Sequence, residues 1–200
     1  MSVPTIEFFW DAASPYTYLA STQIEALAER TGARLAWRPF LLGKVFEATG
    51  NRMPAAVPAK GKHLFADLRR WATHYGVPLT MPRVFPVNSL LALRAGLVAA
   101  EAGQDAAFAK AVMRAYWGEG RDISQAEEVA AVAQSLGLDP PTLLARAGEP
   151  SVKERLRANT EEAVRRGAFG APSFFVGEAL FWGNDRLVLL EEFLRGRLAA

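Results

Sequence analysis

The sequence predicts an α/β protein in which the two ends of the chain form one four-stranded sheet and a block of helices lies between them. Short apolar segments at residues 6–10 and 34–38 have the aromatic or alternating pattern of strands, and two more follow at 172–176 and 179–182. The long stretch between these pairs has the apolar spacing of helices. Half of the 200 residues are apolar and 22% are charged, which is typical of a folded globular protein.

The first three predicted elements are a strand, a helix and a second strand. Residues 6–10 are rich in aromatic side chains and predict a buried strand. Ser14 followed by Pro15 is typical of a helix start, because serine caps the first turn and proline fits the first helical position. Apolar spacing continues this helix to about Thr31. Residues 34–38 then alternate in polarity, so the order predicts two parallel strands joined by a helix.

The middle of the chain is predicted to begin with a long loop and to continue as helices. Residues 42–62 contain Gly43, Gly50, Pro54 and Pro58, which interrupt any periodicity. Long ordered loops often carry function. Helices are predicted after this loop over residues 64–75, 90–102, 106–117, 129–136, a short segment from Asp139, and 151–166.

Two capping boxes are expected to begin two of these helices. Ser124 with Glu127 precedes one helix, and Ser151 with Glu154 precedes another. In such a box the serine side chain and the acidic side chain three residues later bind each other's backbone N–H groups.

The last part of the chain is predicted to be a hairpin followed by a helix. Residues 172–176 and 179–182 are the strands, and Gly177 lies in the tight turn between them. Asn184 and Asp185 are expected to cap the final helix.

The composition excludes several classes of function. There is no cysteine, so disulfides, cysteine nucleophiles, thiolate metal sites and C-x-x-C redox motifs are absent. The two histidines have no acidic neighbours at metal-ligand spacing, so no metal is expected. The net charge is +2, and basic residues are interleaved with acidic ones, which argues against nucleic acid as a partner. No signal peptide or membrane span is visible, so we expect a cytoplasmic protein without a membrane partner.

Three positions could carry chemistry. Ser14 lies at a helix start, where N–H groups and a hydroxyl could stabilise an anion such as a thiolate, although it could also be a simple cap. Pro172 follows Ala171 at the start of a strand; a cis bond there would free the backbone to pair with a peptide, whereas a trans bond would be ordinary. Asn184 and Asp185 could bind a carboxylate and an amine, or could only cap a helix.

The order of these features is that of a thioredoxin-like fold with a large inserted α-helical domain. The thioredoxin-like domain would be discontinuous, comprising residues 1–41 and 169–200, and the loop and inserted helices would occupy 42–168. The chain resembles the 2-hydroxychromene-2-carboxylate isomerases, relatives of the kappa-class glutathione transferases and of the DsbA family. The motifs that carry the resemblance are Phe9-Trp10-Asp11, Ser14-Pro15-Tyr16, Arg38-Pro39-Phe40, Thr49-Gly50-Asn51, Pro58-Ala59-Lys60, Phe85-Pro86-Val87-Asn88, Gly170-Ala171-Pro172 and Trp182-Gly183-Asn184-Asp185-Arg186.

The resemblance implies glutathione as the cofactor, with the Ser14 hydroxyl bound to the sulfur. Further glutathione contacts are implied for Asn51, Lys60, Ala171, Pro172, Asn184 and Asp185. It also implies a cis-trans isomerase that interconverts 2-hydroxychromene-2-carboxylate-type substrates and trans-o-hydroxybenzylidenepyruvate. Such relatives are commonly homodimers, so a homodimer is expected.

An aromatic carboxylate substrate requires apolar walls and a cation. The side chains expected near it are Lys44, Phe46, Arg83, Phe85 and Trp117. Lys44 departs from the family pattern, which has a small residue there. Two alternatives stay open: a kappa-like glutathione S-transferase or peroxidase, and a non-catalytic thioredoxin-like binding module. A disulfide oxidoreductase is excluded by the lack of cysteine.

Overall fold

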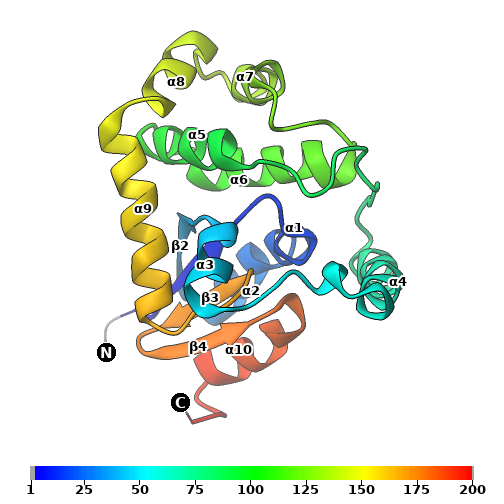
Figure 1. Ribbon diagram of the computed structural model, residues 1–200. Helices are drawn as coiled ribbons and strands as arrows, with labels where there is room; N and C mark the ends of the chain where they lie inside the picture. The colour runs from blue at the N-terminus through cyan, green and yellow to red at the C-terminus, as the bar shows by residue number, and fades with distance from the viewer. Residues whose placement is uncertain (1–2, 200) are drawn as a thin grey trace.

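The computed structural model describes residues 3–199 and places four strands in one mixed sheet. The strands are β1 (Thr5–Trp10), β2 (Arg34–Pro39), β3 (Ser173–Val176) and β4 (Ala179–Trp182). Their order across the sheet is β2-β1-β3-β4, with β1 parallel to β2 and antiparallel to β3, and β3 antiparallel to β4 (Figure 1). The predicted parallel unit and the predicted C-terminal hairpin are both confirmed.

Helices surround this sheet. Figure 1 shows α5 to α8 gathered on one side of the sheet, α9 running along it, and α10 at the opposite end, beside β4. Helix α2 packs against α10 and also lies beside α6, where Glu25 of α2 pairs with Lys110 of α6. The helices are α1 (Pro15–Ser21), α2 (Ile24–Thr31), α3 (Leu42–Thr49), α4 (Pro58–Tyr75), α5 (Leu90–Glu101), α6 (Asp105–Met113), α7 (Ala126–Ser135), α8 (Pro140–Ala147), α9 (Pro150–Arg165) and α10 (Leu187–Leu194). Shorter turns are η1 (Pro54–Ala56), η2 (Arg114–Gly118) and η3 (Asn184–Arg186). Within residues 3–199, no helix is both long and apolar enough to cross a membrane.

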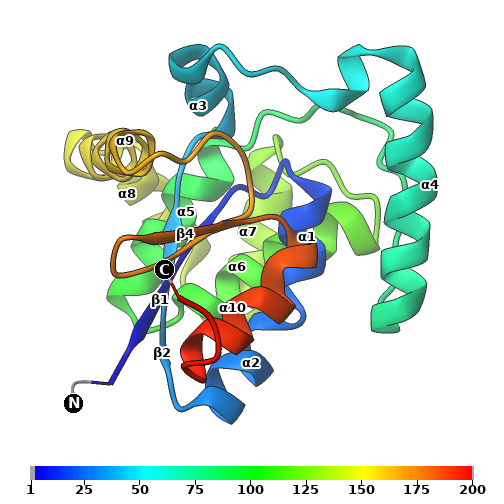
Figure 2. The same cartoon turned by 90° about the horizontal axis from the view of Figure 1, so that it is seen from below.

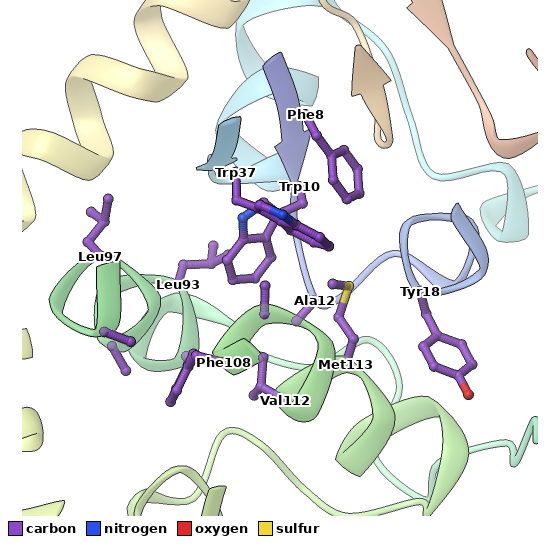
Figure 3. Close-up of a cluster of buried hydrophobic side chains, with 14 of the residues drawn as sticks. Phe8, Trp10, Ala12, Tyr18, Trp37, Leu93, Leu97, Phe108, Val112 and Met113 are labelled. Carbon is purple, nitrogen blue, oxygen red and sulfur yellow. The ribbon is translucent and has the colours of Figure 1, made fainter. Parts of the chain in front are cut away.

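The main core lies between the sheet and the helices α5 and α6. Figure 3 shows Trp10 and Trp37 of the sheet directed toward Leu93 of α5 and Phe108 of α6, and Phe8 of β1 belongs to the same buried cluster. Burial of each such large apolar side chain contributes about 1.5–3 kcal/mol to folding. The Trp10 indole packs so closely on α5 that a Cβ at position 96 would lie 3.0 Å from the ring, which explains the helical Gly96.

The opposite face of β1 packs against α3 and α9. Phe9 alternates with Phe8 along the strand and therefore points to the other side of the sheet, where it contacts Phe40 and Val45. Ala163 of α9 completes this smaller cluster. The strand is thus buried on both faces, which is why its sequence is almost continuously apolar.

The helix predicted from Ser14 to Thr31 is two helices. α1 ends at Ser21 and α2 begins at Ile24. At the junction the Thr22 hydroxyl donates to the carbonyl of Leu19 over 2.7 Å. Side-chain bonds of this kind compete with the helical ladder, and they favour the break.

The loop predicted over residues 42–62 is wrong, because α3 and the start of α4 lie within it. The glycines and prolines that interrupt the pattern act at helix ends: Gly50 ends α3 in the left-handed conformation, with φ +69°, and Pro58 occupies the first position of α4. The first N–H of α3, from Leu42, donates to the carboxylate of Asp11 over 2.8 Å. Because this cap comes from a residue far away in the sequence, the residues around Leu42 do not themselves indicate the start of a helix.

The two expected capping boxes do not form. The Ser124 hydroxyl donates to Asp122, and α7 begins after Gln125 with no side-chain cap. Helix α9 begins at Pro150, one residue before the serine that was expected to cap it. The cap expected from Asn184 and Asp185 is also wrong, because these residues form η3, and α10 begins later without a side-chain cap.

Candidate functional site

A cavity of about 740 Å³ lies where the end of β1, the segment between α3 and α4, and the segment before β3 meet. Its size suits a small-molecule site. Figure 2 shows the connection from α3 to α4 as a long span that carries the chain from one side of the molecule to the other. The lining includes Asp11, Ser14, Tyr16, Phe46, Asn51, Arg52, Met53, Lys60, Asp67, Phe85, Ser89, Gly170, Ala171, Trp182, Asn184 and Asp185.

Ser14 lies in the wall of this cavity and caps α1, as the sequence predicts. Its Oγ accepts the N–H of Thr17 over 3.2 Å. The same hydroxyl donates to the carbonyl oxygen of Ala171 over 3.1 Å. The side chain is buried, with 5% of its surface exposed. These two hydrogen bonds therefore fix the position of the Ser14 hydroxyl in the cavity wall.

Asp11 is a functional candidate that sequence reasoning missed. It is 1% exposed, and its two carboxylate oxygens accept the N–H groups of Ala13 and Leu42 over 2.9 and 2.8 Å. Burial raises the pKa of Asp11, and hydrogen bonds from Ser89 and from the two N–H groups partly oppose that rise. The carboxylate thus joins the turn before Ser14 to the start of α3. The feature of the sequence that could have indicated Asp11 is its position as a single acidic residue directly after an aromatic strand.

The bond between Ala171 and Pro172 is cis, which settles the choice that the sequence left open. The carbonyl oxygen of Pro172 accepts the N–H of Gly183 over 3.0 Å, so this segment is tied to the residues after β4. Gly170 permits the arrangement, because a Cβ there would lie 2.5 Å from Nε1 of Trp182. A second cis bond, between Phe85 and Pro86, lies in the same cavity wall and was not anticipated.

Asn184 and Asp185 follow the hairpin and line the cavity. Asn184 is 3% exposed, and its Nδ2 is buried with no hydrogen-bond partner among the described residues. Asp185 is exposed and pairs with the neighbouring Arg186. Gly183 has φ +105°, a conformation that side chains rarely adopt, and a Cβ there would meet the Asp185 carboxylate. The backbone therefore turns sharply to present both side chains.

Tyr16 and Asp67 add a polar pair that the sequence did not reveal. The Tyr16 hydroxyl donates to the Asp67 carboxylate over 3.0 Å. Burial raises the pKa of Tyr16, and the negative charges of Asp67 and Asp185 raise it further. The phenol is thus neutral, and this side of the cavity is acidic.

Asn51 and Lys60 also line the cavity, as do Phe46 and Phe85. The Asn51 amide is engaged with the protein itself: its Nδ2 donates to the Phe169 carbonyl over 2.7 Å, and its Oδ1 accepts the N–H of Arg52 over 2.8 Å.

Three residues expected near the substrate lie outside the cavity lining. Lys44 is exposed and pairs with Glu47 over 2.6 Å. Arg83 is also exposed and is not part of the cavity lining. Trp117 is fully buried, and its Nε1 donates to the carbonyl oxygen of Ala12 over 2.8 Å, so it supports the loop before Ser14 from behind. Over residues 3–199, the basic side chains that line the cavity are Arg52 and Lys60.

A metal centre has no support in the part of the chain that the structure describes. Over that part, no group of three His, Cys, Asp or Glu side chains is placed to hold a metal ion.

Comparison with known proteins agrees with this fold. A family model described as a DSBA-like thioredoxin domain matches residues 5–195. A 2-hydroxychromene-2-carboxylate isomerase from Sphingobium xenophagum is 38% identical over 192 residues, which cover 95% of this chain and 97% of the relative. Human glutathione S-transferase kappa 1 is 29% identical over 205 residues, covering 95% of this chain and 90% of the relative. A solved structure of a 2-hydroxychromene-2-carboxylate isomerase has a TM-score of 0.88 at 32% identity, covering 96% of this chain and 95% of that chain.

The fold and the family match define the class: a DSBA-like thioredoxin protein. Within that class, the chain belongs to the 2-hydroxychromene-2-carboxylate isomerase family.

Proposed function

We propose that this protein is a glutathione-dependent isomerase that interconverts 2-hydroxychromene-2-carboxylate-type substrates and trans-o-hydroxybenzylidenepyruvate. The observation that carries the proposal is the Ser14 hydroxyl, held against Ala171 in the wall of one large cavity. The relative named for this reaction is 38% identical over nearly the whole chain. Relatives named glutathione S-transferase kappa support glutathione as the cofactor.

The residues of the cavity fit glutathione. The buried Nδ2 of Asn184 is a donor without a partner, and a ligand carboxylate would satisfy it. Asp185 offers a carboxylate for the ligand's amine. The cis bond at Pro172 sets Ala171 beside Ser14, where the cysteinyl part of an extended peptide would pair with the backbone. Lys60 and Asn51 lie along the same cavity wall.

The ring C–O bond of the chromene hemiketal breaks as its hydroxyl proton passes to the phenol oxygen, which gives the open cis keto acid. Glutathione, when bound, would supply a thiolate nucleophile for the conjugated carbon of that keto acid; the double bond becomes a single bond that can rotate, and it forms again when the same thiolate is expelled. Ser14 turns its hydroxyl from Ala171 to the sulfur, while Thr17 keeps Oγ in place. A hydrogen bond to an ionised sulfur is roughly twice as strong as one to a neutral group, so it favours the thiolate.

Apolar side chains supply the walls for an aromatic ring. Phe46 of α3, Met53 and Phe85 line the cavity together with the serine. Such walls bury the ring of a small aromatic substrate and exclude water from the reacting carbons.

We also propose that the chain forms a homodimer. Val188 and Leu189 of α10 are 63% and 41% exposed, and adjacent exposed apolar residues often mark an interface. Size-exclusion chromatography coupled to light scattering would measure the molar mass of the protein in solution. A monomer at all protein concentrations would contradict this part of the proposal.

A kappa-like transferase is the second candidate, because kappa-class relatives are 27–29% identical over most of the chain. The test is turnover of a chromene carboxylate, followed with and without reduced glutathione, beside a set of halogenated aromatics. The isomerase proposal predicts turnover of the chromene carboxylate that requires glutathione. Turnover of the halogenated aromatics alone would favour the transferase, and no glutathione-dependent turnover at all would contradict both.

A further inference from the structure

The cavity lining carries charged side chains of both signs. Asp67 and Asp185 both raise the pKa of Tyr16, so their carboxylates cluster around that phenol. A ligand carboxylate that is not accompanied by an amine is disfavoured there, because like charges repel. Within the described residues, Arg52 and Lys60 are the cations that can attract an anion to the cavity.

Arg52 is anchored beside the Ser14 region by a chain of contacts. Its N–H donates to Oδ1 of Asn51 over 2.8 Å, and Nδ2 of Asn51 donates to the Phe169 carbonyl over 2.7 Å. Phe169 lies two residues before Ala171, which accepts the Ser14 hydroxyl over 3.1 Å. The backbone at Arg52 is therefore fixed to the same segment that fixes Ser14.

The surroundings of Arg52 suit an aromatic anion. Met53 follows it directly and lines the cavity, as does Phe46 of the preceding helix α3. Across residues 3–199, the Arg52 guanidinium forms no ion pair within 4.0 Å. The cations expected from the sequence do not compete for this role: Lys44 is paired with Glu47, and neither it nor Arg83 lines the cavity.

We propose that Arg52 binds the carboxylate of the substrate and so selects aromatic keto acids over their uncharged analogues. This inference rests on the proposed function, because it assigns the cofactor to Ser14, Asn184 and Lys60 and the substrate carboxylate to Arg52, all in the lining of the same cavity. A guanidinium binds a planar carboxylate through two parallel N–H bonds, which Lys60 cannot do. Arg52 is thus a specificity-determining residue, and the apolar side chains beside it hold the ring.

The test uses two ligands that differ in one group. Benzylidenepyruvate and benzylideneacetone share the phenyl ring and the enone, and a carboxylate in the first replaces a methyl group in the second. Dissociation constants are measured by calorimetry with and without S-methylglutathione, which occupies the cofactor site and cannot add to the enone. The proteins are the wild type, Arg52→Gln, Arg52→Lys, Lys44→Gln and the matched control Arg69→Gln, an exposed position on α4 outside the cavity lining.

The proposal predicts that Arg52→Gln weakens benzylidenepyruvate binding by about tenfold or more, the loss expected for a charge-assisted pair. Binding of benzylideneacetone and of S-methylglutathione should stay within about twofold of the wild type, since neither loses a carboxylate contact at Arg52. The dissociation constant of Arg52→Lys for benzylidenepyruvate should lie between those of the wild type and Arg52→Gln, because lysine keeps the positive charge but lacks the planar guanidinium. Lys44→Gln and Arg69→Gln should leave all three ligands unaffected.

Three results would overturn the assignment: an equal loss for both enones, no loss for the keto acid, or a loss for S-methylglutathione, which would give Arg52 to the cofactor instead. Failure of the proposed function is distinguishable, because it would appear as absence of S-methylglutathione binding in the wild type. Benzylidenepyruvate can be titrated without the cofactor, so the effect of Arg52→Gln is measured in either case.

Discussion

The Ser14 hydroxyl donates a hydrogen bond to the carbonyl oxygen of Ala171 over 3.1 Å, although the two residues are 157 positions apart in the chain. One belongs to the start of α1 and the other to the cis peptide before β3. The bond joins the hydroxyl that would stabilise a sulfur anion to the backbone that would hold the cysteinyl part of a peptide. The antiparallel pairing of β1 with β3 brings them together.

Replacing Ser14 by alanine should abolish most turnover while the fold persists. The change removes the donor to the sulfur, and loss of one such donor lowers kcat by about 10²–10³-fold in other enzymes. It also removes the cap of α1, at about 1 kcal/mol. Asp139→Ala is the matched control, because Asp139 caps α8 by accepting the N–H of Thr142 over 3.0 Å, away from the cavity. Equal turnover in both variants would exclude this role for Ser14.

Asp11→Asn should reduce turnover by loosening the start of α3. A carboxamide can accept only one of the two backbone N–H bonds, from Ala13 or Leu42, and its NH₂ group faces the other. We expect a loss of about 1–3 kcal/mol in unfolding free energy. Asp122→Asn is the control, because Asp122 also binds a backbone N–H but lies outside the cavity lining. Steady-state kinetics and urea titration measure both effects; unchanged turnover in Asp11→Asn would contradict a positioning role.

Asp11 should also give the stability a specific pH dependence. Because its pKa is raised in the folded state, the native protein binds more protons than the unfolded chain at pH values between the ordinary carboxyl range and the raised value. The contribution of Asp11 to unfolding free energy therefore falls as pH rises through that window. Urea unfolding of wild type and Asp11→Asn at several pH values isolates this difference. The wild type should lose stability relative to the variant as pH rises, and the opposite slope would refute the raised pKa.

Gly170→Ala should destabilise the cis-proline segment, because the new Cβ would lie 2.5 Å from Nε1 of Trp182. Overpacking of this kind typically costs about 1–3 kcal/mol. Gly43→Ala is the matched control, since Gly43 also lines the cavity but a Cβ there meets nothing within 4 Å. Thermal unfolding measures the difference, and Trp182→Ala in the Gly170→Ala background should recover part of it. A lack of any effect would show that the indole can move freely.

Local patterns in the sequence were sufficient for the strands and for some caps. β1 is short and aromatic, β2 alternates in polarity, and the glycine turn at position 177 separates two further apolar runs. Ser14 and Asp139 both cap the helices expected of them, because a cap depends only on residues within one turn.

Long-range contacts explain what the sequence could not reveal. Helix α3 receives its cap from Asp11 on another element, so its start looks like a loop. Trp117 was expected in the cavity wall, yet it packs behind the Ser14 loop, because helical spacing shows which face is apolar but not what covers it. Lys44 and Arg52 are equally basic in the sequence, and only the course of the chain around Gly50 places the second one in the cavity.

The most direct test is calorimetric titration of the pure protein with reduced glutathione, repeated on Asp185→Ala and Ser14→Ala. The account predicts binding by the wild type and clearly weaker binding by Asp185→Ala, since the carboxylate that would receive the ligand's amine is lost. Ser14→Ala should still bind glutathione, but the thiol of the bound glutathione should lose its proton less readily than in the wild type. No detectable binding by the wild type at millimolar glutathione would contradict the account and would direct the search to a protein partner.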